Sequence, residues 1–192
     1  MATLVLGLVV FLGLHSVRIV ADGWRTRTID RMGAQSWKAL YSIASLVGFA
    51  LIVWGFGLAR TQPVLLWSPP QAMRHLASLL TLLSFVLLVA AYVPGNGIKA
   101  RLHHPMVLSV KAWALGHLLA TGNLAHLVLF GTFLVWAVFN FSAARRRDRV
   151  AQTIYAPGRL PATLLTVALG VLAWVAVAFW LHGWLIGIRP IG

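Results

Sequence analysis

The chain alternates long apolar runs with short polar segments. A helix that spans a membrane needs about 20 mostly apolar residues, and six segments meet or approach that length. They are residues 2–21, 38–59, 74–93, 105–121, 124–144 and 161–186, each with approximate ends. The pattern therefore predicts an all-α fold, a polytopic bundle of six transmembrane helices in a single transmembrane domain over residues 1–192.

The fourth segment is the shortest of the six. It begins at Pro105, a favourable first-turn position because the missing N–H would have no helical partner there. It ends at Thr121-Gly122-Asn123. A tilted span and a partly re-entrant segment both fit this length.

Basic residues gather on one side of the predicted bundle. With six spans, the first, third and fifth connections and their margins share a side and hold thirteen of the sixteen Lys and Arg residues. The opposite side holds Arg60, Arg74 and Arg189. Cytoplasmic loops of membrane proteins are enriched in Lys and Arg, so this split predicts both termini on the outer, periplasmic side.

Composition narrows the possible chemistry. The chain is 60% hydrophobic and 10% charged, whereas soluble domains carry about 25% charged residues. The net charge of +13 lies in short gaps between apolar runs, which suits anionic lipid headgroups better than nucleic acid. There is no cysteine, which excludes disulfides, thiolate catalysis and cysteine-ligated metals.

Histidine is the main chemically capable residue type within the predicted spans. Ionisable residues inside a membrane are functional candidates, and neutral histidine is the commonest metal ligand. His15 lies within the first span, with Arg18 and Asp22 on the same helical face. His117 lies in the fourth span among small residues, including Gly116, and one turn after Trp113. Small residues permit close approach of a helix or of a flat macrocycle, and both interpretations stay open.

The other histidines are weaker candidates. His104, directly before Pro105, is an alternative metal ligand, a helix cap or a supporting group. The remaining four lie near predicted span ends and are His75, His103, His126 and His182. Two histidines on facing helices can bind one haem iron axially. With a rise of about 1.5 Å per residue, His15 and His117 differ in predicted depth by roughly 8 Å, which helix tilt can absorb.

Three blocks of residues together resemble the NnrU family of bacterial membrane proteins, whose domain is shared with 15-cis-ζ-carotene isomerase. The first block is Leu14-His15-Ser16, and the second is Met32-Gly33 with residues 40–46. The third runs from Pro94-Gly95-Asn96-Gly97 through His104-Pro105 and residues 113–120 to Leu129-Phe130-Gly131. The resemblance covers nearly the whole chain and implies a multi-pass protein of the bacterial inner (cytoplasmic) membrane.

The resemblance also implies a cofactor. The isomerase relatives bind haem b and use ferrous iron to isomerise a polyene, with two axial histidines that correspond to His15 and His117. They have a cysteine three residues before the second histidine, where this chain has Ala114, so a cysteine–histidine ligand exchange cannot operate here. NnrU proteins are associated with denitrification and nitric oxide metabolism. His103 and Thr121-Gly122-Asn123 replace the family's usual Arg and Asn-Gly-Asp.

Three functions remain open from the sequence. The favoured hypothesis is a haem b protein of redox or nitrogen-oxide metabolism, with His15 and His117 as iron ligands and Trp113 and Gly116 beside the cofactor. The second is a haem-dependent cis–trans isomerase of a lipophilic polyene, and the third is a cofactor-free assembly or regulatory protein. Whether the chain is an enzyme is therefore not decided, and its expected partners are membrane lipids and a lipophilic small molecule.

Overall fold

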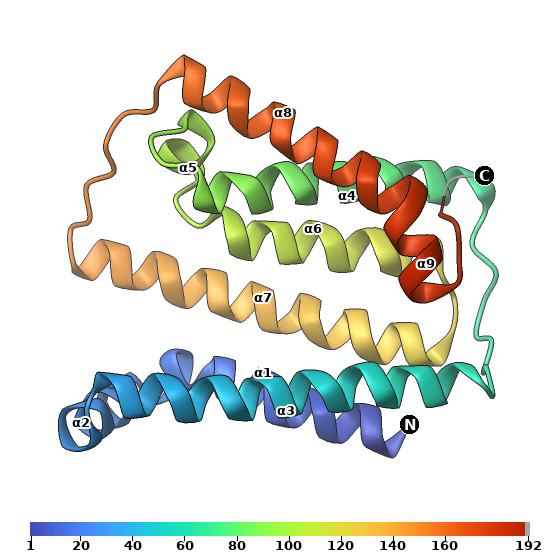
Figure 1. Ribbon diagram of the computed structural model, residues 1–192, viewed down its shortest axis with the longest axis horizontal. Coiled ribbons are helices and arrows are strands. Elements are labelled where there is room, and N and C mark those ends of the chain that lie inside the picture. Colours follow the sequence, from blue (N-terminus) through green and yellow to red (C-terminus); the bar gives the residue numbers. More distant parts are fainter. Residues whose placement is uncertain (191–192) are drawn as a thin grey trace. The chain divides into compact units, whose positions relative to one another are not determined.

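The computed structural model describes residues 1–190, and this part of the chain is all-helical (Figure 1). The elements are α1 (Ala2–Val20), α2 (Asp22–Met32), α3 (Ala34–Arg60), α4 (Gln71–Tyr92), α5 (Gly97–Leu102), α6 (Pro105–Ala120), α7 (Leu124–Val150), α8 (Leu160–Ala176), η1 (Val177–Leu181) and α9 (His182–Ile186). Every predicted span is a helix, with ends that differ by a few residues. The short helices α2 and α5 and the π-helical turn η1 were not predicted.

Five helical stretches within residues 1–190 are long and apolar enough to cross a membrane. They are α1, α3, α4, α7 and the continuous stretch Leu160–Ile186, which contains α8, η1 and α9. The predicted fourth span is α6, with 16 residues and therefore a length of about 24 Å. The chain is therefore a membrane protein with at least these five candidate spans, while the sixth span and the orientation of the termini stay predictions.

The chain divides into two compact units, which are described separately. Unit 1 comprises residues 1–68 and 121–140, and unit 2 comprises residues 69–120 and 141–192. The boundary falls inside α7, so that this helix contributes its first part to unit 1 and its last part to unit 2. Each unit therefore combines segments that are distant in the sequence.

In unit 1, glycines bring α1 and α3 into antiparallel contact. A Cβ added at Gly7 would lie 2.6 Å from the backbone nitrogen of Ile52, and one at Gly48 would lie 2.9 Å from that of Phe11. Gly55 meets the backbone of Leu4 in the same way. Small residues at membrane helix interfaces permit such close backbone approach, which increases van der Waals contact.

Backbone hydrogen bonds connect the turn before α7 to the loop after α3. The Gly122 carbonyl accepts hydrogen bonds from the backbone N–H groups of Leu66 at 2.8 Å and Trp67 at 3.2 Å. Leu124 donates its backbone N–H to the Val64 carbonyl at 2.9 Å. A Cβ at Gly122 would collide with the Trp67 carbonyl, so a glycine is required by the close approach of two backbones.

In unit 2, α4 packs against both α6 and α8 (Figure 1). Ser84 on α4 donates to the carbonyl of Ser109 on α6 at 2.9 Å, and both serines are buried. Trp174 on α8 donates its indole N–H to the Thr81 hydroxyl at 3.1 Å. Thus α4 supplies polar partners to both of its neighbours within an otherwise apolar interface.

The turn between α4 and α5 is held by one buried side chain. Asn96, only 1% exposed, donates to the carbonyls of Ala90 at 2.9 Å and Val93 at 2.6 Å. Its side-chain oxygen accepts the Lys99 backbone N–H at 2.8 Å and caps α5. The Pro-Gly-Asn-Gly motif therefore has a structural role, because it ends α4 and starts α5.

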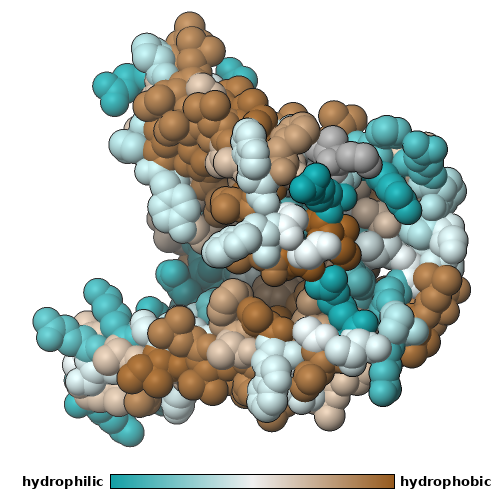
Figure 2. All heavy atoms as spheres, turned by 45° about the vertical axis from the view of Figure 1, so that its right-hand side comes forward, coloured by the Kyte–Doolittle hydropathy of each residue, from teal (hydrophilic) through white to brown (hydrophobic). Residues whose placement is uncertain are grey.

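Many exposed side chains of the helices are apolar, and they form the large brown areas on the face seen in Figure 2. Val9 on α1, Leu40 on α3 and Leu79 on α4 are each at least 60% exposed. Exposed apolar side chains of this number and size are unfavourable in water but suit contact with lipid chains.

Candidate functional site

His15 lies in α1 with its ring orientation fixed by the backbone. Its Nδ1–H donates to the Phe11 carbonyl oxygen at 2.7 Å, one helical turn earlier. The ring stacks on Phe11 at a centroid distance of 4.2 Å, and Tyr41 and Trp136 lie at 5.3 and 6.2 Å. Because Nδ1 carries the proton, the neutral ring has its lone pair on Nε2, which is the atom available to bind a metal.

His117 in α6 repeats this arrangement in unit 2. Its Nδ1–H donates to the Trp113 carbonyl oxygen at 2.8 Å, and the Trp113 ring lies 5.3 Å from the imidazole. A backbone carbonyl that accepts the Nδ1 proton is a common supporting partner of metal-binding histidines, since it fixes both tautomer and orientation. His15 and His117 therefore share one local geometry, although they belong to different units.

The two residues predicted beside His117 have distinct roles. Trp113 supplies the carbonyl that orients the imidazole. Gly116 faces α4, where an added Cβ would lie 3.2 Å from the Ala77 carbonyl oxygen and 3.3 Å from Leu80 Cβ. Ala114, at the position of the relatives' cysteine, is fully buried. The small size of Gly116 thus serves the α4–α6 contact, which is the helix-interface interpretation of this residue.

His182, which the sequence placed only near the end of the last predicted span, lies close to His117. The two rings lie 6.5 Å apart with an angle of 22° between their planes. His182 also donates Nδ1–H to a carbonyl, that of Ile188, at 2.7 Å. It follows directly after the π-helical turn Val177–Leu181, which changes the helical phase before it. The apolar pattern of this segment carries no signal for such a turn.

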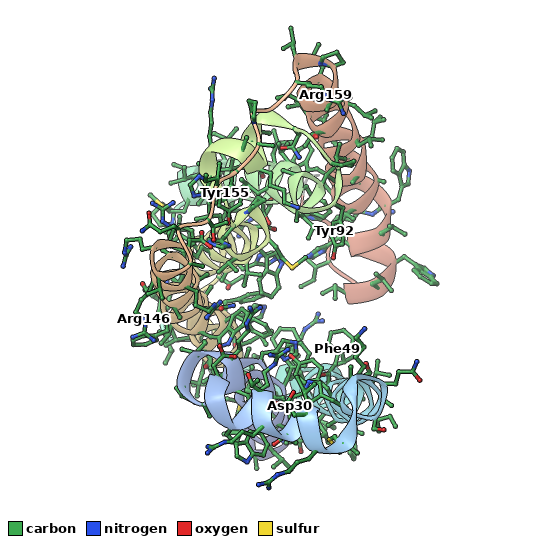
Figure 3. The ribbon with its side chains drawn as sticks, turned by 90° about the vertical axis from the view of Figure 1, so that its left-hand side faces the viewer. Asp30, Phe49, Tyr92, Arg146, Tyr155 and Arg159 are labelled. Carbon is green, nitrogen blue, oxygen red and sulfur yellow. The ribbon has the colours of Figure 1, made fainter. Side chains whose placement is uncertain are left out.

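His104 is paired with a carboxylate. Its Nε2–H donates to Asp148 Oδ2 at 2.7 Å, and the Tyr155 hydroxyl donates to the same oxygen at 3.0 Å. Tyr155, labelled in Figure 3, lies in the segment after α7. The interpretation of His104 as a supporting polar group agrees with this pairing, whereas Asp148 and Tyr155 were not identified from the sequence.

His103 completes the polar cluster around Tyr155. Its ring stacks on that of Tyr155 at 4.0 Å with an angle of 3°, and Arg145 donates to its Nδ1 at 3.0 Å. His103 has a positive φ of 67°, a conformation that non-glycine residues seldom adopt. Partial burial, together with the hydrogen bond to Asp148 and its negative charge, raises the pKa of the Tyr155 phenol above its ordinary value of 10.0.

The two remaining histidines lie apart from these groups. His126 packs edge-on against Phe56 at 5.0 Å, and its buried Nδ1 has no hydrogen-bond partner within residues 1–190. His75 is exposed at the start of α4. In the described part of the chain, no three side chains of His, Cys, Asp or Glu gather as a metal site. A haem iron requires only two axial ligands, so its binding does not depend on such a group.

Sequence comparison identifies the class of this membrane protein. The sequence model of the family described as NnrU protein matches residues 3–190, nearly the whole chain. The chain therefore belongs to the NnrU family. Searches of curated proteins and of solved structures found no match.

Proposed function

We propose that this NnrU-family protein binds haem b through His15 and His117 and acts in redox or nitrogen-oxide metabolism. The observation that supports the proposal is the shared geometry of these two histidines, each with Nδ1–H held by the carbonyl one turn earlier. In a chain without cysteine, the Nε2 atoms of these two imidazoles would be the metal-binding atoms.

The surroundings of the two rings suit a porphyrin chemically. Phe11, Tyr41 and Trp136 surround His15, and Trp113 lies beside His117. Apolar and aromatic side chains around a haem restrict water and help to set the properties of its iron. Haem b would supply an iron that changes between the ferrous and ferric states. The protein's own contribution would be to orient both imidazoles through the backbone carbonyls that accept their Nδ1 protons.

We further propose six spans in the inner (cytoplasmic) membrane of a bacterium, with both termini in the periplasm. The strongly unequal distribution of Lys and Arg supports this topology. In this topology, α6 is the fourth span and is added to the five long apolar helical stretches. Its 16 residues cover about 24 Å of a hydrocarbon core of roughly 30 Å, a mismatch that local thinning of the bilayer accommodates.

The haem proposal is tested by the absorption spectrum of protein purified after haem-replete expression. We expect a Soret band that is lost or displaced in His15→Ala and in His117→Ala, because each substitution removes one axial nitrogen. His75→Ala is the matched control, since this histidine is exposed and distant in sequence from both.

Two outcomes would contradict the haem proposal. A wild-type protein without a Soret band would favour the cofactor-free interpretation. A Soret band unchanged in both histidine variants would show that haem binds elsewhere.

A further inference from the structure

Lys111 lies near the middle of the apolar helix α6, in unit 2. It follows Pro105, the first residue of this helix, by six positions and precedes Ala120, the last, by nine. The other Lys and Arg residues of the long apolar helices are at most five residues from a helix end. A charged side chain within a membrane is costly and is therefore a functional candidate by default.

The surroundings of Lys111 satisfy its charge only in part. Its Nζ lies 4.2 Å from the centre of the Phe141 ring on α7, which is a cation–π contact. The side chain is half-buried, and within residues 1–190 its ammonium forms no hydrogen bond and no ion pair. An ammonium has three N–H donors, which one aromatic face does not satisfy. Lys111 is thus placed to accept an anionic partner.

The chain itself offers Lys111 no side-chain carboxylate as a counter-ion. The sequence contains three acidic residues. Asp22 and Asp30 belong to α2 in unit 1. Asp148, near the end of α7, already accepts two hydrogen bonds from other side chains. The anion best suited to Lys111 therefore comes from outside the polypeptide.

The proposed cofactor carries such an anion. Haem b has two propionate carboxylates on one edge of its ring, and the proposed function places its iron on His117 of the same helix. Lys111 precedes His117 by six residues, about 9 Å along the helix axis at 1.5 Å per residue. With about 3.6 residues per turn, the two side chains diverge by about 120° around that axis. Lys111 therefore does not compete for the iron, and its position suits the edge of a macrocycle rather than its centre.

We propose that the ammonium of Lys111 binds a propionate of the haem and so orients the acidic edge of the macrocycle toward the start of α6. The contact is a charge-assisted hydrogen bond in an apolar region, where such bonds are strong. The proposal rests on the proposed haem function and deepens it. His15 and His117 bind the iron, whereas Lys111 selects the orientation of the ring.

The propionate contact is tested by comparing haem with its dimethyl ester, in which both carboxylates are neutral. Haem-free protein in detergent micelles is titrated with ferric haem or with the ester, and the Soret band gives the two dissociation constants. Their ratio reports the preference for the free acid, and any difference in how the two compounds partition into micelles cancels between variants. We expect Lys111→Met to lower this preference roughly tenfold relative to wild type, because one hydrogen bond between charged groups is lost.

Three further variants control for charge and folding. Lys99→Met removes the other lysine of unit 2, whose Nζ already donates to the Ala91 carbonyl at 3.0 Å, and should leave the preference unchanged. Lys111→Arg keeps a cation at the site and should retain most of the preference. Lys111→Leu repeats the neutral replacement with another apolar side chain. Thermal unfolding of the haem-free proteins shows which variants are folded.

Two results would overturn the proposal while haem binding stands. One is an equal preference for the free acid in wild type and in the folded neutral variants of Lys111. The other is an equal loss of preference in Lys99→Met, which would assign the effect to net charge. A wild-type protein that gives no Soret band with either compound would instead refute the proposed haem function, and this contact with it.

Discussion

At the scale of single residues, Asp148 is an acid whose side chain joins distant segments of the chain. It is the only acidic residue after Asp30 in the sequence, and it follows a run of three arginines. One of its oxygens nevertheless accepts hydrogen bonds from His104 and Tyr155, which lie 44 residues before it and 7 residues after it. This carboxylate therefore connects the start of α6, the end of α7 and the segment that leads to α8.

Replacing Asp148 should destabilise unit 2. In Asp148→Asn the amide cannot carry the charge that strengthens both hydrogen bonds, and bonds to charged groups contribute about 1.5–3 kcal/mol each. We expect a loss of about 2 kcal/mol in the free energy of unfolding, because the side chains are one-fifth exposed and asparagine keeps part of the contact. Thermal unfolding in detergent measures this loss of stability. Asp30→Asn, on exposed α2, should change the midpoint little, and equal effects of the two variants would refute the assignment.

Because of Tyr155, the stability of the folded protein should depend on pH in the alkaline range. Its pKa is raised in the folded protein by partial burial and by Asp148, so the folded state holds this proton more tightly than the unfolded state. The resulting contribution is complete below the ordinary tyrosine pKa of 10.0 and is lost as the pH rises through the folded-state value. Tyr155→Phe should therefore flatten the decline in unfolding midpoint above pH 10, a value taken from the ordinary pKa. A decline identical to that of wild type would contradict this.

The sequence identified candidate residues better than it identified their partners. His15 and His117 could be selected because an ionisable residue within an apolar run is conspicuous. Their backbone acceptors are one turn away and follow from helix geometry alone. The partner of His104 is 44 residues distant, and pairing at that separation depends on how helices pack. The proximity of His182 to His117 depends on a π-helical turn that the apolar pattern does not encode.

At the scale of elements, the long helices could be predicted from the sequence, whereas the short helices in the segments that connect them could not. A run of about 20 apolar residues must form a helix in a membrane, because the backbone has no other hydrogen-bond partner there. This constraint predicted all the long helices. It does not apply to α2 and α5, whose polar sequences lie outside the apolar runs. The cap of α5 by Asn96 is visible in the sequence only once a helix start at Gly97 is known.

The α1–α3 interface should be sensitive to added volume at Gly7, whereas Gly57, which lies on α3 away from close neighbours, should tolerate it. In Gly7→Ala the new methyl group would lie 2.6 Å from the Ile52 backbone nitrogen, so the helices must separate. Overpacking of this kind costs about 1–3 kcal/mol. Gly57→Ala meets no atom within 4 Å and should be neutral or slightly stabilising, because alanine favours the helix. Unfolding midpoints of the two variants in the same detergent measure the difference. Similar destabilisation by both would argue against close packing at Gly7.

At the scale of the whole molecule, the proposed topology can be tested with reporter fusions. Alkaline phosphatase is active only in the periplasm and green fluorescent protein fluoresces in the cytoplasm. We expect phosphatase activity for fusions after Gly192 and between α3 and α4, and fluorescence for fusions after Arg31 and after Val150. Five spans instead of six, with α6 outside the membrane core, would place the C-terminus on the same side as the α2 connection. Fluorescence from the C-terminal fusion would therefore refute the six-span arrangement.

The division of unit 1 between two stretches of the chain has a consequence for synthesis. Residues 121–140 belong with residues 1–68, and Gly122 is tied to the loop after α3, but α4, α5 and α6 are translated between them. The ribosome therefore releases most of α4–α6 into the bilayer before unit 1 can acquire its last helix. Likewise, unit 2 is complete only after α8 has been synthesised. Neither unit is a contiguous piece of the chain, so cutting the gene after residue 68 would separate residues 1–68 from residues 121–140, which complete unit 1, while the second product would keep both segments of unit 2.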